Sequence, residues 1–422
     1  MRKLVLTLAT GLVLAAALLA AAGWAAPARA GVVATLRFYH TPPAGWQQKP
    51  AGALLKWQRQ TQYSKPLRGL QGYRIMYVSR GAVHGPAQGA KVYETGMVYI
   101  PVGKTAPHGG WPIVAWGHGT SGVGDSAAPS RYPWLYPEPV DQQWLVYGRF
   151  VGKAGRLGAI VTCPDYEGLG TPGMHTYLNR GSEGRSMIDA VRAARHLAAM
   201  LHVPSSRRWV GAGHSQGGQA AIAAAELAST YGRNLSLRGT IALAPGDNLL
   251  ETMKPAETDA MWYPYFGYMA WGVKANDTEH RFVFSGMLGP WVLGVVDKAP
   301  RSYFDQWWAL LLLAHWDGVY PDGAPMTPAA ADVVAPGWES DPSVQRFFAD
   351  AQLGLRRASG PILVVQGTDD LLYPTYEKML GQLRAAGDQV TGIVLSGRDH
   401  DQAVPYGTPA ALAFLQKRLI AK

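Results

Sequence analysis

The sequence predicts an α/β protein with a mostly parallel sheet of eight strands and helices on both faces. From about residue 73 onward, short apolar runs of strand length alternate with longer helical patterns, which is typical of parallel sheets covered by helices. Of the 422 residues, 48% are hydrophobic and 16% are charged, so the chain can bury a large core and is not a disordered protein. The 50 glycines and 30 prolines supply the many turns that such a fold requires.

The expected elements follow in chain order. Residues 31–72 contain a Pro-Pro pair and several polar turns, and we expect them to form an irregular wrap. The eight expected strands are 73–78, 92–100, 113–116, 159–162, 208–212, 239–243, 362–366 and 389–395. The expected helices are 182–201, 216–231, 376–386 and 408–420.

Residues 1–30 have the pattern of a secretory signal peptide. A positively charged start precedes an almost wholly apolar run over 4–22 and a small-residue cleavage site that ends at Ala30. The alternative is an uncleaved membrane anchor, which the helix-breaking Pro27 and the cleavage site disfavour. We therefore expect export, with a secreted or periplasmic mature chain.

Residues 248–345 interrupt the alternation of strands and helices. We expect them to form a cap or lid inserted between two parts of the core, 31–247 and 346–422. The segment holds seven of the chain's 15 tryptophans. These aromatic side chains either fill the cap's own small core or line an apolar substrate pocket.

Charge and cysteine content narrow the range of partners. The formal net charge is +10, and removal of residues 1–30, with three basic residues and no acid, leaves +7. The basic residues are scattered and form no nucleic-acid-binding motif, so the charge favours a lipid or other anionic surface over nucleic acid. Cys163 is the only cysteine, which excludes an intramolecular disulfide. No metal, Walker or dinucleotide motif occurs, so we expect no metal and no cofactor. We also expect the protein to be a monomer.

Six of the expected strands run into short polar or glycine-rich turns. In a parallel sheet these turns meet at the carboxyl edge and line one cleft. One of them, Gly213-His-Ser-Gln-Gly217, has the G-x-S-x-G pattern between a strand and an alanine-rich helix. Glycines on both sides permit the sharp turn that lifts a serine hydroxyl clear of the sheet. We expect Ser215 to be a nucleophile, and the alternative is a purely structural glycine turn.

A serine nucleophile needs a base, and the base needs an acid to orient it. Three histidines follow Ser215, and of these only His400 lies in a turn after an expected strand. The alternative for His400 is a surface imidazole paired with a neighbouring aspartate. Asp369 and Asp370, directly after the expected strand 362–366, compete for the role of the acid.

The oxyanion of acyl transfer needs two backbone N–H donors. We expect one from Gln216, at the start of the helix that follows the serine. The second is expected from the turn after the third strand, from the N–H of Thr120 or, in its place, Gly119. Tyr166 and Glu167, in the next turn along the chain, are candidate substrate-binding residues, and the preferred interpretation of the Glu167 carboxylate is that it pins its loop.

Taken in order, these motifs resemble the secretory lipase family of α/β-hydrolases. The resemblance covers most of 90–420 and rests on WGHGTSG at 116–122, PDYEGLG at 164–170, SMIDAVRA at 186–193, GHSQGG at 213–218, QGTDD at 366–370 and DH at 399–400. The chain is also similar to the bacterial secreted branch thought to act on plant cell-wall or lipid esters. One departure is Gln366, where many hydrolases have histidine.

The resemblance implies an α/β-hydrolase fold, a cap over the active site, no cofactor, and ester hydrolysis by a triad of Ser215, His400 and Asp370. It thereby favours Asp370 over Asp369. The expected substrate is a small-molecule or polymer-linked ester. A serine peptidase on the same fold is the alternative within the hydrolases, and a non-catalytic module that holds a glycan or lipid under the cap is the alternative of a different class.

Overall fold

The computed structural model describes residues 37–61, 67–82, 89–131, 142–259, 262–296 and 330–420. The expected signal peptide and about a third of the expected cap lie outside these ranges. The chain divides into two compact units, residues 1–42 and 43–422. In the first unit, residues 37–40 form a helical turn, and all that follows concerns the second unit.

One nine-stranded sheet organises the chain, in the order β1-β2-β3-β5-β4-β6-β7-β8-β9. Strands β4 to β9 run parallel to one another, whereas β1, β2 and β3 pair antiparallel and β3 joins β5 antiparallel. The strands are β1 (Leu54–Arg59), β2 (Leu70–Arg80), β3 (Lys91–Pro101), β4 (Trp111–Gly117), β5 (Ile160–Pro164), β6 (Ser205–His214), β7 (Ser236–Leu243), β8 (Ile362–Gly367) and β9 (Val390–Leu395). The predicted fold class is confirmed, but the predicted count of eight strands was wrong.

The missed strand is β1, which lies in the segment expected to form an irregular wrap. It pairs with β2 from Leu54, opposite Tyr77, to Arg59, opposite Tyr73, with an irregularity between Leu54 and Lys56. Its side chains are half-buried or exposed, because it is an edge strand with a partner on one side only. An edge strand needs no buried face, so its sequence carries no clear alternation of apolar and polar residues.

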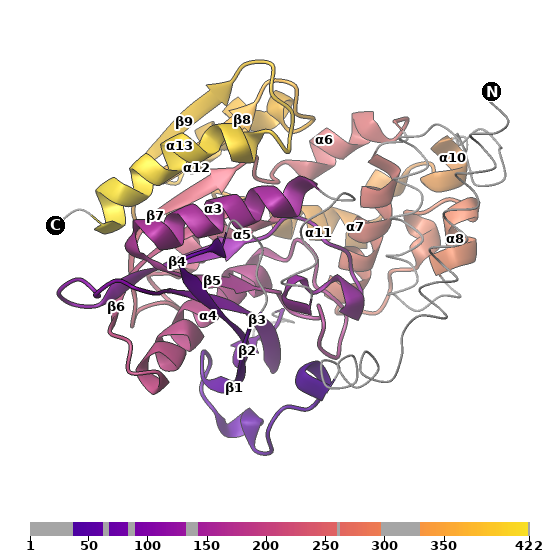
Figure 1. The fold of residues 1–422 in the computed structure, drawn as a ribbon. Coiled ribbons are helices and arrows are strands. Elements are labelled where there is room, and N and C mark those ends of the chain that lie inside the picture. The colour runs from indigo at the N-terminus through magenta and orange to yellow at the C-terminus, as the bar shows by residue number, and fades with distance from the viewer. Residues whose placement is uncertain are drawn as a thin grey trace, which may run out of the picture. The chain divides into compact units, whose positions relative to one another are not determined.

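Helices cover both faces of the sheet, as Figure 1 shows. On one face lie α3 (Gln142–Gly158), which was not predicted, and α13 (Ala403–Leu415), which pack on one another. Their apolar side chains form a cluster with alternate residues of the strands, including Ile241, Leu243, Leu363 and Val365. The other face carries α4 (Arg180–Met200), α5 (Gln216–Leu227) and α12 (Tyr376–Ala385), and here the intervening strand residues, such as Ala242 and Val364, are buried. Successive strand side chains point to opposite faces, so the two clusters share the same strands.

Between β7 and β8 the chain forms helices that pack around an apolar cluster of their own. They are α6 (Leu249–Ala256), α7 (Tyr263–Asn276), α8 (Pro290–Val296), α10 (Ala330–Val333) and α11 (Pro342–Ala351), seen at the right of Figure 1. Phe266 and Trp338 are buried at the centre of the cluster with ring centroids 5.3 Å apart. Of the seven tryptophans expected in the cap, Trp307, Trp308 and Trp316 fall outside the described residues. Within the described residues, no helix is long and apolar enough to cross a membrane.

Candidate active site

Ser215 lies in the turn between the end of β6 and the start of α5. Its backbone has φ 55° and ψ −122°, a conformation that residues other than glycine rarely adopt. The neighbouring strand holds it there, because the Ser215 N–H donates a hydrogen bond to the carbonyl oxygen of Leu243 at 3.0 Å. The Ser215 carbonyl in turn accepts from the N–H of Gln219 at 3.1 Å. This is the strained strand-to-helix turn that the G-x-S-x-G pattern predicts.

The glycines around Ser215 are required by contacts between backbones. A Cβ atom placed on Gly217 would lie 2.1 Å from the carbonyl oxygen of Gly117, and one on Gly213 would lie 2.1 Å from the carbonyl oxygen of Gly217. Gly117 ends β4, the strand next to β6. Because the obstructing atoms belong to the backbone, no side-chain rotation relieves these contacts. The serine turn and the turn after β4 are therefore packed against one another as a rigid pair.

His400 and Asp370 lie in the turns after β9 and β8. The Nδ1 atom of His400 is 2.7 Å from Oδ2 of Asp370, whose side chain is completely buried. The N–H of Leu372 donates to the other carboxylate oxygen of Asp370 at 2.9 Å, and the side chain of Gln366 donates to Oδ2. Gln366, the departure from the hydrolase pattern, thus fixes the carboxylate. Asp369 is exposed and accepts a hydrogen bond from the Thr368 hydroxyl at 2.9 Å, so the geometry pairs His400 with Asp370.

The charge of Asp370 makes His400 a stronger base. Burial lowers the pKa of His400, but the charge and hydrogen bond of Asp370, with smaller contributions from Asp401 and Asp399, outweigh burial and raise the pKa to about 8. Burial raises the pKa of Asp370, but the charge and hydrogen bond of His400 outweigh it, so the net pKa of Asp370 is lowered. The carboxylate therefore remains ionised at neutral pH and directs the Nδ1 proton of His400.

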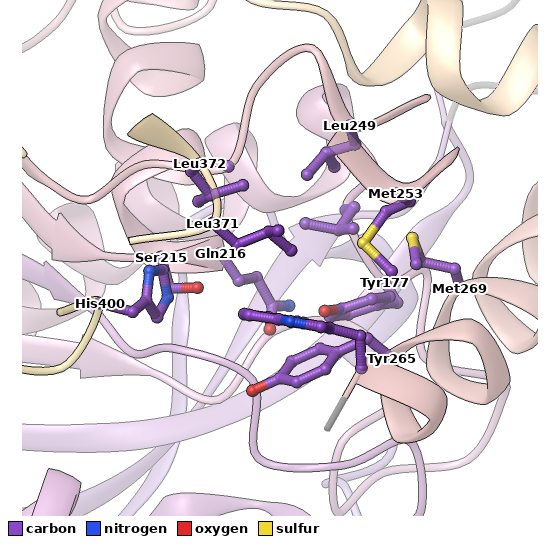
Figure 2. Close-up of a pocket in the computed structure, with 13 residues that line it drawn as sticks. Tyr177, Ser215, Gln216, Leu249, Met253, Tyr265, Met269, Leu371, Leu372 and His400 are labelled. Carbon is purple, nitrogen blue, oxygen red and sulfur yellow. The ribbon is translucent and has the colours of Figure 1, made fainter. Parts of the chain in front are cut away.

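Ser215 and His400 line the same pocket. Figure 2 shows Ser215 and His400 among the side chains that line this pocket. The rest of the lining is mainly apolar. It comes from the loop before α4, the first residue of α5, helices α6 and α7, the residue directly before α7, and the turns after β7 and β8. These residues are Tyr177, Leu178, Gln216, Gly246, Leu249, Met253, Trp262, Tyr265, Met269, Leu371 and Leu372.

Of the three expected oxyanion donors, one lines the pocket and two do not. Gln216 lines it as the first residue of α5, where the N–H groups of a helix are directed outward. Thr120 does not itself line the pocket, and its hydroxyl is 2.7 Å from the hydroxyl of Tyr177, which does. Gly119 packs behind the serine turn, where an added Cβ would lie 2.5 Å from the Tyr147 hydroxyl. The second donor from the turn after β4 remains a prediction.

The structure does not place Tyr166 and Glu167 in the lining of the pocket. Tyr166 is fully buried, and its hydroxyl donates to the carbonyl oxygen of His118 at 3.1 Å. The Glu167 carboxylate accepts from the N–H of Ala82 at 2.9 Å and from the hydroxyl of Thr176 at 3.1 Å. These bonds fix the loop after β5 in place, which agrees with the interpretation that Glu167 pins its loop. Neither Tyr166 nor Glu167 lines this pocket.

Two groups next to the site were not anticipated from the sequence. Glu183, on α4, accepts at Oε1 from the Gln216 side chain at 2.7 Å and from the N–H of Leu178 at 2.8 Å. Burial raises the pKa of Glu183 to about 8, so its carboxyl group is largely protonated at neutral pH. Tyr147, on α3, contacts His214. Neither residue belongs to a motif, and Glu183 is one of several charged residues in α4, so nothing in the sequence singled it out.

Two other buried carboxyl groups accept hydrogen bonds from hydroxyl groups. Glu94 accepts from the hydroxyls of Tyr77 and Ser186, each at 2.8 Å, and Asp165 accepts from Thr95 at 2.7 Å. Burial raises the pKa of Glu94 to about 8. Across the part of the chain that the structure describes, no three His, Cys, Asp or Glu side chains are grouped so as to hold a metal ion.

Known proteins share part of this sequence and the overall fold. The sequence pattern of the secretory lipase family matches residues 149–282, which include the serine turn. No curated protein sequence matches. Many solved structures share the fold. A putative hydrolase from Legionella pneumophila is 20% identical, with a TM-score of 0.65 over 86% of this chain and 97% of that one.

The rice cell wall degrading esterase LipA from Xanthomonas oryzae is 18% identical, with a TM-score of 0.64 over 88% of this chain and 99% of that one. Candida antarctica lipase A in its closed state is 15% identical, with a TM-score of 0.68 over 90% of this chain and 85% of that one. The expected resemblance to secretory lipases and the expected class of enzyme, a carboxylic ester hydrolase, are confirmed.

Proposed function

We propose that this carboxylic ester hydrolase of the secretory lipase type works through a triad of Ser215, His400 and Asp370. The observation that carries the proposal is the 2.7 Å contact between His400 Nδ1 and Asp370 Oδ2, made by a histidine that lines the same pocket as Ser215. With Nδ1 directed to the carboxylate, Nε2 is the nitrogen left to take a proton from the serine hydroxyl.

The reaction then proceeds in two acyl-transfer steps. The Oγ atom of Ser215 attacks the acyl carbon while His400 accepts the hydroxyl proton, and backbone N–H groups stabilise the oxyanion. His400 returns the proton to the departing alcohol, which leaves Ser215 acylated. Water attacks the acyl-enzyme with His400 again as the base, and the acid is released. Gln216 is the proposed first oxyanion donor and Thr120 the second.

The lining of the pocket supports an apolar acyl group. Leu249, Met253 and Met269 come from α6 and α7, and they face the pocket with the aromatic rings of Trp262 and Tyr265. Methionine side chains adapt to varied apolar shapes. We propose that residues 248–345 act as a cap and that the acyl chain lies against this wall. A narrower pocket in Met253→Trp should lower activity on long acyl chains more than activity on acetyl esters.

Export and the type of alcohol form part of the same proposal. Residues 1–30 are proposed to direct secretion, and the mature chain, with a net charge of +7, is proposed to act as a monomer on esters attached to a polymer or lipid surface. A cell-wall ester is one such substrate class, and the X. oryzae neighbour is a cell wall degrading esterase.

Labelling with a fluorophosphonate tests the chemistry directly. The mature protein should react once per molecule, and Ser215→Ala should not react. A matched variant, Ser121→Ala, removes a nearby serine hydroxyl after β4 and should leave labelling intact. A wild-type protein that fails to label would refute the enzymatic proposal and favour a binding module.

A substrate panel then defines the reaction. p-Nitrophenyl esters from acetyl to palmitoyl, set against peptide anilides, separate esterase, lipase and peptidase activity. We expect ester cleavage with a preference for acyl groups longer than four carbons. A sharp preference for two to four carbons would contradict the proposed role of the α6 and α7 wall, and faster cleavage of anilides would favour a peptidase.

A further inference from the structure

We propose that Tyr147 and His214 form a positioning pair that fixes the backbone of His400 in its place relative to Ser215. The inference rests on the proposed role of His400 as the base. His214 is the residue directly before the nucleophile, and Tyr147 lies on α3, far away in sequence. Neither touches the proposed site of acyl transfer, so both act through His400.

Two hydrogen bonds connect the three residues. The hydroxyl of Tyr147 is 2.6 Å from Nδ1 of His214, and Nε2 of His214 is 3.0 Å from the carbonyl oxygen of His400. The imidazole rings of His214 and His400 lie 4.7 Å apart, centroid to centroid. Tyr147 and His214 are both buried, with exposed fractions of 3% and 1%, so water does not compete for these bonds.

The partners of His214 determine which of its nitrogens carries the proton. A carbonyl oxygen only accepts hydrogen bonds, so Nε2 of His214 must be the donor to His400. In a neutral imidazole the other nitrogen is then an acceptor, and the hydroxyl of Tyr147 must donate to Nδ1. Tyr147 therefore stabilises the single tautomer of His214 that can hold the His400 carbonyl.

The environment of His214 keeps this imidazole neutral while His400 gains and loses a proton. Burial, followed by the charge of His400, lowers the pKa of His214 to about 4, and the opposing charges of Asp401 and Asp370 are smaller influences. A neutral His214 avoids repulsion with the His400 imidazolium that forms during catalysis. The base is thus held at two points, by Asp370 at its ring and by His214 at its backbone.

The pair also contacts the turn after β4. A Cβ atom on Gly119 would lie 2.5 Å from the Tyr147 hydroxyl and 3.3 Å from Nδ1 of His214. The Tyr147–His214 pair therefore contacts three turns. One is the turn after β4, which is expected to supply an oxyanion donor, and the others hold Ser215 and His400. Positioning matters because a small misplacement of the base relative to the nucleophile lowers the rate of proton transfer.

Tyr147→Phe tests the pair, because it removes one oxygen atom and keeps the ring. NMR of the protein with 15N-labelled histidine reports the tautomer of His214, and a His214→Gln spectrum assigns the signal. We expect the Nε2–H form in the wild type and a mixture of tautomers in the variant. We also expect kcat to fall about tenfold with KM unchanged within about twofold, as for the loss of one buried hydrogen bond in the transition state. The matched control is Tyr77→Phe, which removes a buried hydroxyl bonded at 2.8 Å to Glu94 and should leave kcat unchanged.

Two variants of His214 separate positioning from folding. Gln retains an amide donor for the His400 carbonyl and should keep kcat within roughly fivefold of wild type, whereas Leu has no donor and should lower kcat by about 10- to 100-fold. Thermal melting checks that each variant is folded. The proposal is overturned if His214 is an Nδ1–H tautomer in the wild type, or if Tyr147→Phe and folded His214→Leu keep wild-type kcat.

Failure of the proposed function has a different signature. If the wild type does not react with a fluorophosphonate, the role of His400 as the base is wrong, whatever the tautomer of His214. If labelling occurs and depends on Ser215 while both pair variants react at the wild-type rate, only the positioning proposal fails.

Discussion

Asp370→Asn is the substitution whose effect the structure predicts in most detail. The N–H of Leu372 donates to Oδ1 of Asp370, so an asparagine would keep its carbonyl oxygen at that position. Its NH2 group would then replace Oδ2 and face His400 Nδ1 at 2.7 Å. Gln366, which donates to Oδ2 in the wild type, can turn its amide and accept from this NH2 group through its own carbonyl oxygen. Two donors cannot share a hydrogen bond, so His400 must move its proton to Nε2, the atom that has to accept the proton of Ser215.

The expected loss follows from that tautomer. The same replacement in other serine hydrolase triads lowers kcat by about 10⁴, and we expect a loss of about 10³ to 10⁴, which corresponds to about 4 to 5 kcal/mol of transition-state stabilisation. KM should change little because Asp370 does not line the pocket. The control is Asp369→Asn, an exposed neighbour bonded to Thr368, which should retain activity within about twofold.

The pH dependence supplies a second signature. His400 must be neutral to act as a base, so wild-type activity on a p-nitrophenyl ester should rise with pH through a midpoint near 8. Without the carboxylate charge, the midpoint of Asp370→Asn should move to lower pH. Steady-state rates from pH 5.5 to 9.5, corrected by fluorophosphonate titration of active sites, measure both effects. Asp370→Asn with more than a tenth of wild-type activity, or inactivity confined to Asp369→Asn, would refute the reasoning.

Two further substitutions test the packing and the buried charges. Gly217→Ala places a methyl group 2.1 Å from the Gly117 carbonyl oxygen and should destabilise the protein by about 3 kcal/mol or more. The control is Gly211→Ala, whose new methyl group has its nearest contact at 3.5 Å and should cost less than about 1 kcal/mol. Denaturant unfolding compares the two variants, and equal stabilities would contradict the backbone-contact argument. Burial raises the pKa of Glu94 to about 8. Its contribution to stability is therefore fully present below the unfolded value near 4.5 and is lost as pH rises towards 8, by about 1.4 kcal/mol per pH unit. Glu94→Gln should reduce this decline in unfolding free energy between pH 5 and 8, and an unchanged slope would show that Glu94 is already ionised at pH 5.

The sequence predicted those elements whose residue types reflect how deeply they are buried. Strand β8 is buried along its whole length, and its continuous apolar run identified it as a central strand. Strand β1 is six residues long and contains Lys56, Gln58 and Arg59, so it lacks the run of β-branched and apolar residues that marked the other edge strand, β9. Ser215 was found from the glycines that flank it in the G-x-S-x-G pattern, and His400 from its place after a strand.

Asp369 and Asp370 could not be separated by pattern alone, because adjacent side chains in a turn face different surroundings that only the folded chain defines. Tyr147 reaches His214 from a helix distant in sequence, and Tyr177 reaches the pocket from a distant loop. Their positions depend on packing between elements, for which no short motif exists.

The pocket has one further consequence for the evolution of substrate preference. Five of its lining residues, from Leu249 to Met269, come from one stretch of 21 consecutive positions. The reactive groups come from turns at the ends of β6, β8 and β9. A mutation or segment exchange within 249–269 can therefore reshape the binding wall without altering the proposed triad. Recombination among related genes at this segment would produce enzymes that share one chemistry and differ in the esters they select.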